Sequence, residues 1–423
     1  MKKLLYLSSI VALLASCLTE KNADPGKPST FVRYFNGGNN DFAKLAEETS
    51  DKGIIILGTT EITNEDLTKR YKIKLVKTDE YGNVIWQNLY PADFAVTAEN
   101  ISGQGLLQLT TGGTTSGFLV IGKKIISPER SEMHLIQVSD NGELVNQKTI
   151  DFSSIILPGS AIQGQAIQLN NNGNYLVLGV FQAVPDPVTG KIDENNMVLA
   201  ELDKADLSIK WVKKYGAGKA SLSNKIYLDG SNNVVWSGTV TRNASSDIRL
   251  VKTAQNSLNT IFDLQIGSPN FQETGNDICR YGNGFAVVGA TNEKTGVDDD
   301  ILLKFLADDG SEVKSVSFGF GDTDIGNSVI SGRGGVVVLG TSKAIPEDLG
   351  GRGEEDYYLA KYDAFGNALW SAPKIFGSKN KDTGASVRQL SDGSLLILGT
   401  TEFGGVNRNT MMLMKADSEG NIE

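Results

Sequence analysis

Cysteine and histidine are scarce in this sequence, which has two cysteines and one histidine among 423 residues. Cys17 lies in an N-terminal apolar segment, so Cys279 has no partner for an internal disulfide, and the fold must hold without covalent cross-links. A single histidine, His134, is too few for a zinc site built on histidine and cysteine, and no nucleophile accompanies it in a recognisable motif. We therefore expect His134 to be structural and Cys279 to be a small buried residue.

Positive charge is also in the minority. Lys and Arg number 40 against 50 Asp and Glu, which gives a net charge of −10. No block of consecutive basic residues occurs, whereas a nucleic-acid-binding protein needs a basic face. This balance argues against nucleic acid as a partner and fits a protein whose folded part faces water.

Long apolar runs are missing as well, since no stretch reaches the roughly 18 residues that a transmembrane helix needs. The N-terminal "MKKLLYLSSIVALLASC" has two lysines, a short apolar stretch from Leu4 to Leu14, and then small residues before Cys17. Its end, "LLASC", resembles the lipobox of bacterial lipoproteins. That resemblance implies a signal peptide over residues 1–16, acylation of Cys17, and attachment to a lipid bilayer in the bacterial envelope, at the outer membrane. An ordinary secretory signal is the alternative. Residues 17–30 are polar and read as a flexible tether.

An apolar run that ends in glycine recurs along the rest of the chain. The copies are "IIILG", "FLVIG", "YLVLG", "VVWSG", "FAVVG", "VVVLG" and "LLILG", ending at Gly58, Gly122, Gly179, Gly238, Gly289, Gly340 and Gly399. Each run is preceded by one short apolar segment and followed by two more, with Gly, Asn or Asp between them. Seven units of four strands predict an all-β fold, a seven-bladed β-propeller over residues 31–423. A solenoid is the alternative, but it needs capping units at both ends.

The two ends of the chain complement each other. The last unit has three strands and stops at "DSEGNIE", while "TFVRYFNGG" follows the tether. Aligned on "IKWVKKYGAG", Phe31 takes the place of Trp211 and Phe35 that of Tyr215. We expect this N-terminal strand to complete the seventh blade and close the ring, which removes the open sheet edges.

Loop lengths differ between the two predicted faces of the propeller. Turns between strands one and two, and three and four, are short, whereas connections between strands two and three are long. Long loops on one side of a rigid scaffold favour a binding face there, over the channel mouth. Charged candidates on these loops are Arg70, Arg130, Asp186, Arg242, Arg352 and Arg408.

Acidic residues are the remaining candidates for chemistry. Asp298, Asp299, Asp300, Asp322 and Asp324 are close enough in sequence to hold a hard cation such as Ca²⁺, although no complete calcium-loop motif is present. Turn and strand-start roles are the alternative, and a pair of acids that cleaves a glycoside is a further one. No other metal or cofactor is expected. Trp86, Trp211 and Trp370 recur at one place in the fourth strand and, with Trp236, are interpreted as core residues rather than a ligand-stacking set.

The repeat "DEYGNVIW", which returns as "DAFGNALW", together with the "LGTT" strands resembles the propeller repeats of Bacteroidetes-type surface and secreted proteins, over about residues 31–423. It is also distantly similar to quinoprotein repeats, but it lacks their Thr-Gly pair and has seven units rather than eight. The resemblance implies a non-enzymatic lipoprotein. We therefore expect a monomeric binding or scaffold propeller for a protein or glycan, with a carbohydrate hydrolase or lyase using acids near the channel mouth as the alternative.

Overall fold

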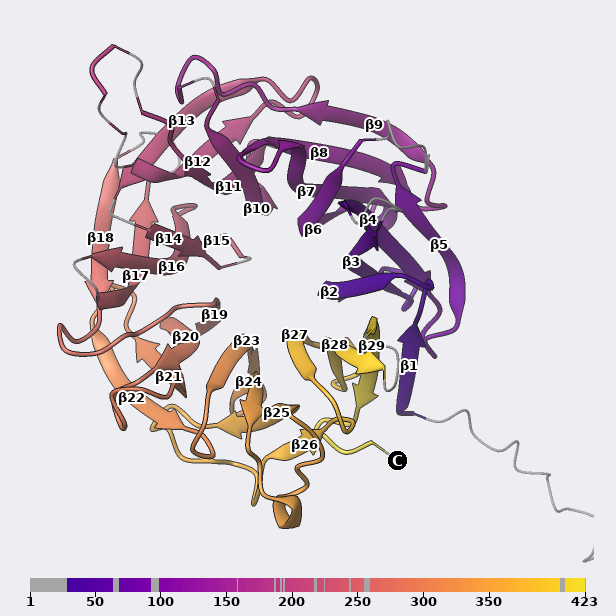
Figure 1. The fold of residues 1–423 in the computed structure, drawn as a ribbon, viewed down its shortest axis with the longest axis vertical. Coiled ribbons are helices and arrows are strands. Elements are labelled where there is room, and N and C mark those ends of the chain that lie inside the picture. Colours follow the sequence, from indigo (N-terminus) through magenta and orange to yellow (C-terminus); the bar gives the residue numbers. More distant parts are fainter. Residues whose placement is uncertain are drawn as a thin grey trace, which may run out of the picture.

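The chain forms a ring of seven antiparallel sheets around a central channel in a computed structural model (Figure 1). The structure describes residues 29–63, 68–92, 99–157, 159–185, 188–190, 192, 195–216, 219–223, 225–242, 245–254, 259–403 and 408–422. The predicted signal peptide, the acylation site Cys17 and the loop candidate Asp186 lie outside these residues. The fold is the predicted all-β, seven-bladed propeller.

Each blade contributes one strand to each of four concentric positions. The innermost strands are β2 (Asn40–Glu48), β6 (Ile101–Thr111), β10 (Ala161–Leu169), β14 (Lys219–Leu222) with β15 (Tyr227–Leu228), β19 (Asp277–Tyr281), β23 (Asp324–Gly332) and β27 (Asp382–Gln389). The second strands are β3 (Ile54–Thr63), β7 (Thr114–Ser127), β11 (Tyr175–Gln182), β16 (Val234–Arg242), β20 (Gly284–Thr291), β24 (Gly335–Lys343) and β28 (Leu395–Phe403). The third strands are β4 (Lys69–Thr78), β8 (Arg130–Ser139), β12 (Asn195–Leu202), β17 (Ser245–Thr253), β21 (Asp300–Leu306), β25 (Glu355–Tyr362) and β29 (Arg408–Ala416). The outermost strands are β5 (Val84–Tyr90), β9 (Leu144–Thr149), β13 (Ile209–Gly216), β18 (Thr260–Ile266), β22 (Glu312–Phe318), β26 (Lys374–Phe376) and β1 (Phe31–Phe35).

The N-terminal strand closes the ring as predicted. β1 pairs antiparallel with β29, from Phe31 opposite Lys415 to Phe35 opposite Met411. The order β1-β29-β28-β27 makes this the seventh blade, so its outermost strand comes from the start of the chain and the other three from its end. Phe31 and Phe35 are both buried, at 5% and 4% exposure. Closure therefore leaves no blade without its fourth strand.

The glycine-ended runs are the second strands, and their uniform apolarity follows from stacking of the blades. Both faces of a blade pack on neighbouring blades, so successive residues such as those from Ile54 to Leu57 are all buried. The terminal glycine is required by a close approach of the backbone in the innermost strand or just before it. A Cβ on Gly289 would lie 1.7 Å from the carbonyl oxygen of Thr274, and one on Gly122 would lie 1.9 Å from that of Ser102. A side chain has no room at this point.

The D-x-x-G-N repeat forms the tight turn before the outermost strand. In its first copy the Asp79 carboxylate accepts hydrogen bonds from the backbone N–H groups of Tyr81 and Asn83 and from the Asn83 amide. The glycine, Gly82 in this copy, has a φ of 76°, in the left-handed region that favours glycine. A Cβ there would meet the Phe31 ring at 2.8 Å, and on Gly142 it would meet the equivalent Trp86 ring at 2.9 Å. The turn glycine of each of these blades thus packs on the outer aromatic of the preceding blade, as the alignment of Phe31 with a tryptophan predicts.

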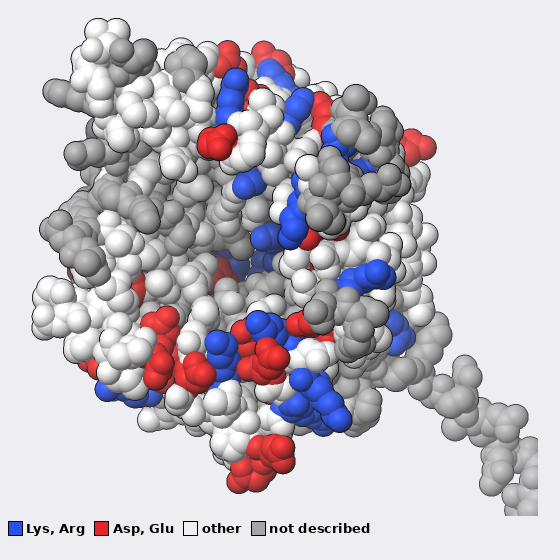
Figure 2. All heavy atoms as spheres, in the orientation of Figure 1, with Lys and Arg blue, Asp and Glu red and all other residues white. Residues whose placement is uncertain are grey.

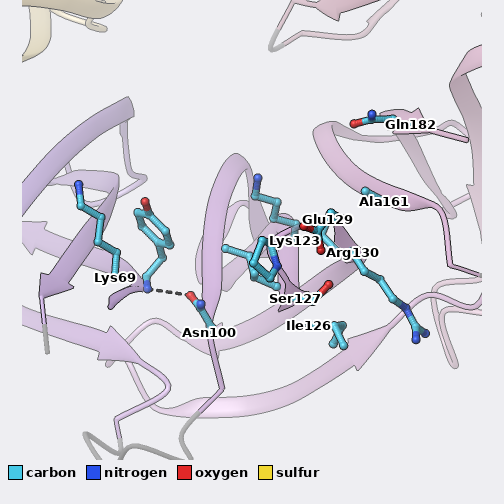
Figure 3. Close-up of a pocket in the computed structure, with 13 residues that line it drawn as sticks. Lys69, Asn100, Lys123, Ile126, Ser127, Glu129, Arg130, Ala161 and Gln182 are labelled. Carbon is cyan, nitrogen blue, oxygen red and sulfur yellow. Dashed lines mark hydrogen bonds between the residues drawn. The ribbon is translucent and has the colours of Figure 1, made fainter. Parts of the chain in front are cut away.

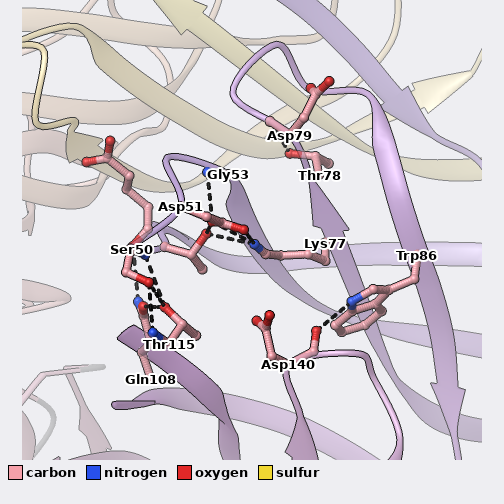
Figure 4. A network of polar contacts seen from close by, with 12 residues as sticks. Ser50, Asp51, Gly53, Lys77, Thr78, Asp79, Trp86, Gln108, Thr115 and Asp140 are labelled. Carbon is pink, nitrogen blue, oxygen red and sulfur yellow. Dashed lines mark hydrogen bonds and ion pairs between the residues drawn. The ribbon is translucent and has the colours of Figure 1, made fainter. Parts of the chain in front are cut away.

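Polar contacts also join blades at this short-turn end (Figure 4). The Trp86 indole donates to the carbonyl oxygen of Asp140 in the next blade at 2.8 Å. The Ser50 backbone N–H donates to Thr115 Oγ1 in the next blade at 3.1 Å. Within blade one, Lys77, only 2% exposed, places its ammonium 2.7 Å from the Asp51 carboxylate. Hydrogen bonds and ion pairs of this kind hold the short-turn face together, so we interpret it as a structural end of the ring.

The long connections lie at the opposite end, together with the links between blades. The longest described one, between β24 and β25, contains the 3₁₀ turn η1 (Glu347–Leu349). Blade two departs from the expected pattern, because β7 extends to Ser127 and β8 begins at Arg130, so its strands rather than a loop project from this face. No helix in the described part of the chain has the length and apolar character needed to cross a bilayer.

Candidate functional site

The long-loop face is hollowed where blades one, two and three meet. A cavity of about 620 Å³ lies between the ends of β4, β7, β8 and β11 and includes Lys69, Lys123 and Arg130 in its lining (Figure 3). A second cavity of about 250 Å³, with Lys44 and Gln104 in its wall, opens beside it on the innermost strands. Tyr71, Lys123 and Ile125 line both cavities, so the two adjoin. Figure 2 shows Lys and Arg side chains around the central hollow on this side of the ring. We call these two cavities the basic mouth.

Lys123 occupies a position that has a structural role in other blades. In each second strand, one residue follows the glycine that ends the apolar run. In blades one, four, six and seven this residue is a threonine: Thr59, Thr239, Thr341 and Thr400. Each of these hydroxyls hydrogen-bonds the backbone of the next blade's inner strand; for example, the N–H of Ala43 donates to Thr400 Oγ1 at 3.0 Å. In blade two a lysine replaces this threonine. The replacement gives up a contact between blades and brings an ammonium to the cavity.

Lys44 reaches the channel wall through a β-bulge. The register between β2 and β3 shifts between Ala43 and Leu45, which leaves Lys44 unpaired in the ladder and re-aims its side chain. The inner strands of four other blades have a bulge at the same place, and the bulged residues there are Gln104, Gln165, Asn327 and Ala385. Lys44 is the charged member of this set, and it lies in the blade next to Lys123.

Neither ammonium has an acidic partner among the described residues. Burial, and then the charge of Lys123, lower the pKa of Lys44, and burial lowers that of Lys123. Both side chains are only half-buried, so water still reaches them. By contrast, Lys69 pairs with Glu61 at 3.0 Å and Arg130 with Glu132 at 2.8 Å. Two neighbouring cations without a counter-ion favour binding of an anion.

Charges deeper in the channel are paired. Lys225 lies 2.6 Å from Asp277, which also accepts hydrogen bonds from the Ser328 hydroxyl and the backbone N–H of Val329. Glu47 lies 3.8 Å from Arg388. Burial raises the pKa of Glu47, and the two nearby cations oppose that rise. The basic mouth therefore differs from the rest of the channel in leaving positive charge uncompensated.

Neutral polar groups complete the basic mouth. Asn100 accepts a hydrogen bond from the Tyr71 backbone N–H at 2.8 Å, the dashed line in Figure 3. The Tyr71 hydroxyl donates to Glu61 at 3.2 Å, and burial followed by the Glu61 charge raises its pKa. Tyr71 thus acts as a neutral hydrogen-bonding group rather than as a base. Ser102 and Gln104 offer further donors and acceptors.

The arginine candidates from the sequence do lie at the long-loop end of the second and third strands. Arg130 lines the larger cavity, whereas Arg70 is at the start of β4, Arg408 at the start of β29, and Arg352 is exposed beside η1. Arg242 ends β16, and its side chain is outside what the structure describes. The loop-based reasoning pointed to this face, which stays a prediction, and did not single out Lys44 and Lys123. The signal was present in the repeats: both are lysines at positions where the sister blades have uncharged residues.

The acidic candidates are mostly turn and strand-start residues. Asp322 is exposed and accepts the backbone N–H of Thr323, and Asp298 is in the loop before β21. Burial raises the pKa of Asp299, and its two neighbouring aspartates raise it further. Asp324 is fully buried and accepts the backbone N–H of Phe320, which fixes the link between blades five and six. Within the described residues no three or more His, Cys, Asp or Glu side chains converge as a metal site.

The structure brings two of these acids together. Asp300 and Asp324 lie on either side of Gly319, where a Cβ would be 2.5 Å from one carboxylate and 2.1 Å from the other. Lys294 pairs with Asp300 at 3.0 Å and so supplies a positive charge to this junction.

The aromatic, histidine and cysteine candidates are structural. Trp236 is fully buried, and Trp370 is 8% exposed but precedes the short β26 instead of belonging to it, so the fourth-strand assignment for this tryptophan is wrong. Nearby proline and the bends around it end the strand pairing there. His134 is buried with Nδ1 2.9 Å from the Thr149 hydroxyl. Cys279 is buried as expected, and burial raises the pKa of its thiol to about 12.

Solved β-propellers are similar to this structure. The polysaccharide lyase Uly1 has a TM-score of 0.51 and 11% identity, covering 90% of each chain. The Dos1 propeller has a TM-score of 0.49 and 11% identity, covering 92% of this chain and 95% of that one. The β-propeller domain of the trilobed protease from Pyrococcus furiosus has a TM-score of 0.47 and 10% identity, covering 89% and 93%. No protein-family model and no curated protein sequence matches this chain. At such low identity the likeness to the lyase shows the fold alone.

Proposed function

We propose that this protein is a non-enzymatic binding propeller that holds an acidic glycan, one carrying carboxylate or sulfate groups, in the basic mouth. The observation that carries the proposal is the pair Lys44 and Lys123, two recessed ammonium groups with no described acidic partner in a protein of net charge −10. An anionic ligand would relieve their mutual repulsion and the cost of their burial.

A glycan suits the rest of the lining better than an acidic peptide does. Beyond the lysines, the two cavities present amide and hydroxyl groups such as Asn100, Ser102, Gln104 and Gln182, which match sugar hydroxyls. The larger cavity, about 620 Å³, has the size of a typical small-ligand site. Saccharide units could therefore lie across blades one to three with an acidic group at the lysines.

Binding is favoured over cleavage by the placement of carboxylates. Among the described residues that line the basic mouth, Glu129 is the one acid, and a glycosidase needs two carboxyl groups flanking the bond. In the channel below, Glu47 and Asp277 each face a cation. The Tyr71 phenol, whose pKa is raised, is a poor base for a lyase reaction.

The proposed envelope anchor agrees with the direction of the closing strand. β1 begins at Phe31 beside the turn glycine Gly82, so it enters the ring from the short-turn end. A tether from an acylated Cys17 would then hold the short-turn face toward the bilayer and leave the basic mouth facing away from it. Metabolic labelling with palmitate, with Cys17→Ala as the control, tests this anchor.

Binding is tested with immobilised polygalacturonate and chondroitin sulfate, with neutral dextran and a poly-glutamate peptide for comparison. We expect binding to the two acidic glycans and none to dextran, and a loss of about tenfold or more in affinity for Lys44→Gln or Lys123→Gln. Lys314→Gln, which removes an exposed lysine from β22, is the matched control and should bind normally. Equal binding by all three variants, or preference for the peptide, would contradict the proposal.

A further inference from the structure

Buried acids also meet at the junction between blades six and seven, on the same end of the ring as the basic mouth. Asp356 at the start of β25 and Asp382 at the start of β27 lie on either side of Gly377. A Cβ on that glycine would be 1.9 Å from Asp356 Oδ1 and 3.2 Å from Asp382 Oδ2. The two carboxylates are therefore neighbours, and they are 1% and 0% exposed.

One oxygen of each carboxylate is already used by the backbone. Asp356 Oδ2 accepts the N–H of Arg352 at 2.9 Å, and Asp382 Oδ2 accepts the N–H of Ser378 at 2.6 Å. The other oxygen of each, Oδ1, is buried without a hydrogen bond of normal geometry. The Thr401 and Ser378 side chains, which lower the pKa of Asp382, are its nearest neutral contacts, whereas no such contact is described for Asp356 Oδ1. Two buried carboxylates with little compensation leave a desolvation cost.

At equivalent junctions elsewhere in the ring, a lysine compensates the charge of the acid. Between blades seven and one, Lys74 places its ammonium 2.7 Å from Asp41, next to Gly37. Between blades five and six, Lys294 pairs with Asp300 at 3.0 Å, and between blades four and five, Lys304 pairs with Glu273 at 3.0 Å. Among the described residues, neither Asp356 nor Asp382 has such a lysine or arginine. A protein-borne cation is present at three junctions and has no described counterpart at this one.

We propose that the blade six–seven junction binds a divalent cation of the Ca²⁺ class between Asp356 and Asp382. The free Oδ1 atoms supply two anionic oxygen ligands of the kind that Ca²⁺ prefers. The carbonyl oxygens of Ser378 and Asn380, which lie 2.7 and 2.3 Å from a Cβ placed on Gly353, belong to the same link and offer neutral ligands. The ion takes the role that Lys74 has at the next junction. This site differs from the cluster around Asp298 to Asp300 that the sequence suggests.

The rival explanation is one proton shared by the two acids. Burial raises the pKa of Asp382, hydrogen bonds from Thr401 and Ser378 oppose that rise, and the Asp356 charge adds to it, so a shared proton also fits the pair. The two explanations differ in what stabilises the fold. A bound cation stabilises it in proportion to the metal concentration, whereas a shared proton stabilises it as the pH falls and is indifferent to metal.

The test is thermal unfolding of the full chain after EDTA treatment and desalting, with CaCl₂ or MgCl₂ added back. We expect CaCl₂ to raise the unfolding midpoint by about 3 °C or more, and calorimetric titration to give a site that Asp382→Asn and Asp356→Asn both abolish. Asp41→Asn, which changes the equivalent acid whose cation is Lys74, is the control; it lowers stability but keeps the calcium response. No calcium response in the unaltered chain, or a response that survives both junction variants, overturns the proposal. If Asp382→Asn unfolds, Ca²⁺ titration of the unaltered chain with Tb³⁺ luminescence still decides it, because Tyr357 lies at the junction and sensitised emission requires a nearby tyrosine.

Discussion

Blades one and two leave positive charge unpaired, whereas blades six and seven leave negative charge unpaired. At the basic mouth, Lys44 and Lys123 have no described acidic partner, and at the six–seven junction Asp356 and Asp382 have no described basic one. The two pairs do not neutralise each other, because Asp356 and Asp382 are buried between blades six and seven, whereas the two lysines line cavities at blades one to three.

The two regions differ in how the unpaired charge arises from the repeat. Lys123 departs from the threonine of four sister blades, so a structural contact has been exchanged for a half-buried cation. Asp356 and Asp382 instead keep the acids that other junctions have, and what is missing is the neutralising lysine. The first is a site open to an outside ligand, and the second is buried and suited to a structural ion.

The largest effect is expected where a junction already has its cation. Lys74→Met leaves Asp41, which is fully buried, without its ammonium partner. Breaking a buried ion pair on one side costs about 3–5 kcal/mol. Chemical denaturation of the full chain should show a loss of this size, and Lys314→Met should show none. A loss below about 1 kcal/mol would mean that these junctions tolerate unpaired acids, and would weaken the comparison.

Lys123→Thr restores the residue of the sister blades and should separate function from stability. Affinity for acidic glycans is expected to fall by about tenfold or more, while the free energy of unfolding rises by about 0.5–1 kcal/mol, the worth of one added hydrogen bond. Glycan binding and denaturation of one preparation check both halves. A variant that is less stable than the original chain would show that Lys123 supports the fold.

Binding should also depend on pH in a definite direction. The pKa of Lys44 and that of Lys123 are lowered in the free protein, and an anion stabilises their charged forms. Affinity should therefore be constant at neutral pH and decrease as the pH rises toward the alkaline range, before ordinary lysines lose their protons. The same shift predicts that the free protein gains stability over that range, because the buried charges are lost. Affinity that stays level until ordinary lysines lose their protons would contradict this account.

The smallest effect is expected at the rim of the basic mouth. Lys69 and Arg130 already have carboxylate partners, so Arg130→Gln should change affinity by about threefold or less and act mainly on the association rate. Surface plasmon resonance at two salt concentrations measures this. If Arg130→Gln lowered the affinity as much as Lys123→Gln does, the binding site would have to lie farther from the channel than proposed.

The fold was largely predictable from the sequence because the repeat encodes it locally. The glycine-ended runs mark strands buried on both faces, and the pairing of Phe31–Phe35 with β29 follows from an aromatic spacing shared with Trp211 and Tyr215. Trp370 was misplaced because its motif matches the other copies, while the residues after it do not extend the pairing with β25.

For the candidate site, the sequence indicated a face of the ring but not the residues that form the site. Loop length indicated the long-loop end, where the candidate site lies, but Lys44 and Lys123 lie on strands, and their proximity depends on a β-bulge and on which blades are adjacent. Likewise Asp356 and Asp382 are separated by a strand and two links in sequence, and only the geometry of the junction brings them together at Gly377. Comparison of each repeat with its sister copies, rather than a search for motifs, is the method that would have found the lysines.

The most direct test is a crystal structure of the propeller with a bound oligogalacturonate or sulfated oligosaccharide. The account predicts a carboxylate or sulfate group within hydrogen-bond distance of both Lys44 Nζ and Lys123 Nζ, with sugar rings extending toward Arg130. A ligand bound at the short-turn face, or an acidic group that contacts neither lysine, would contradict it.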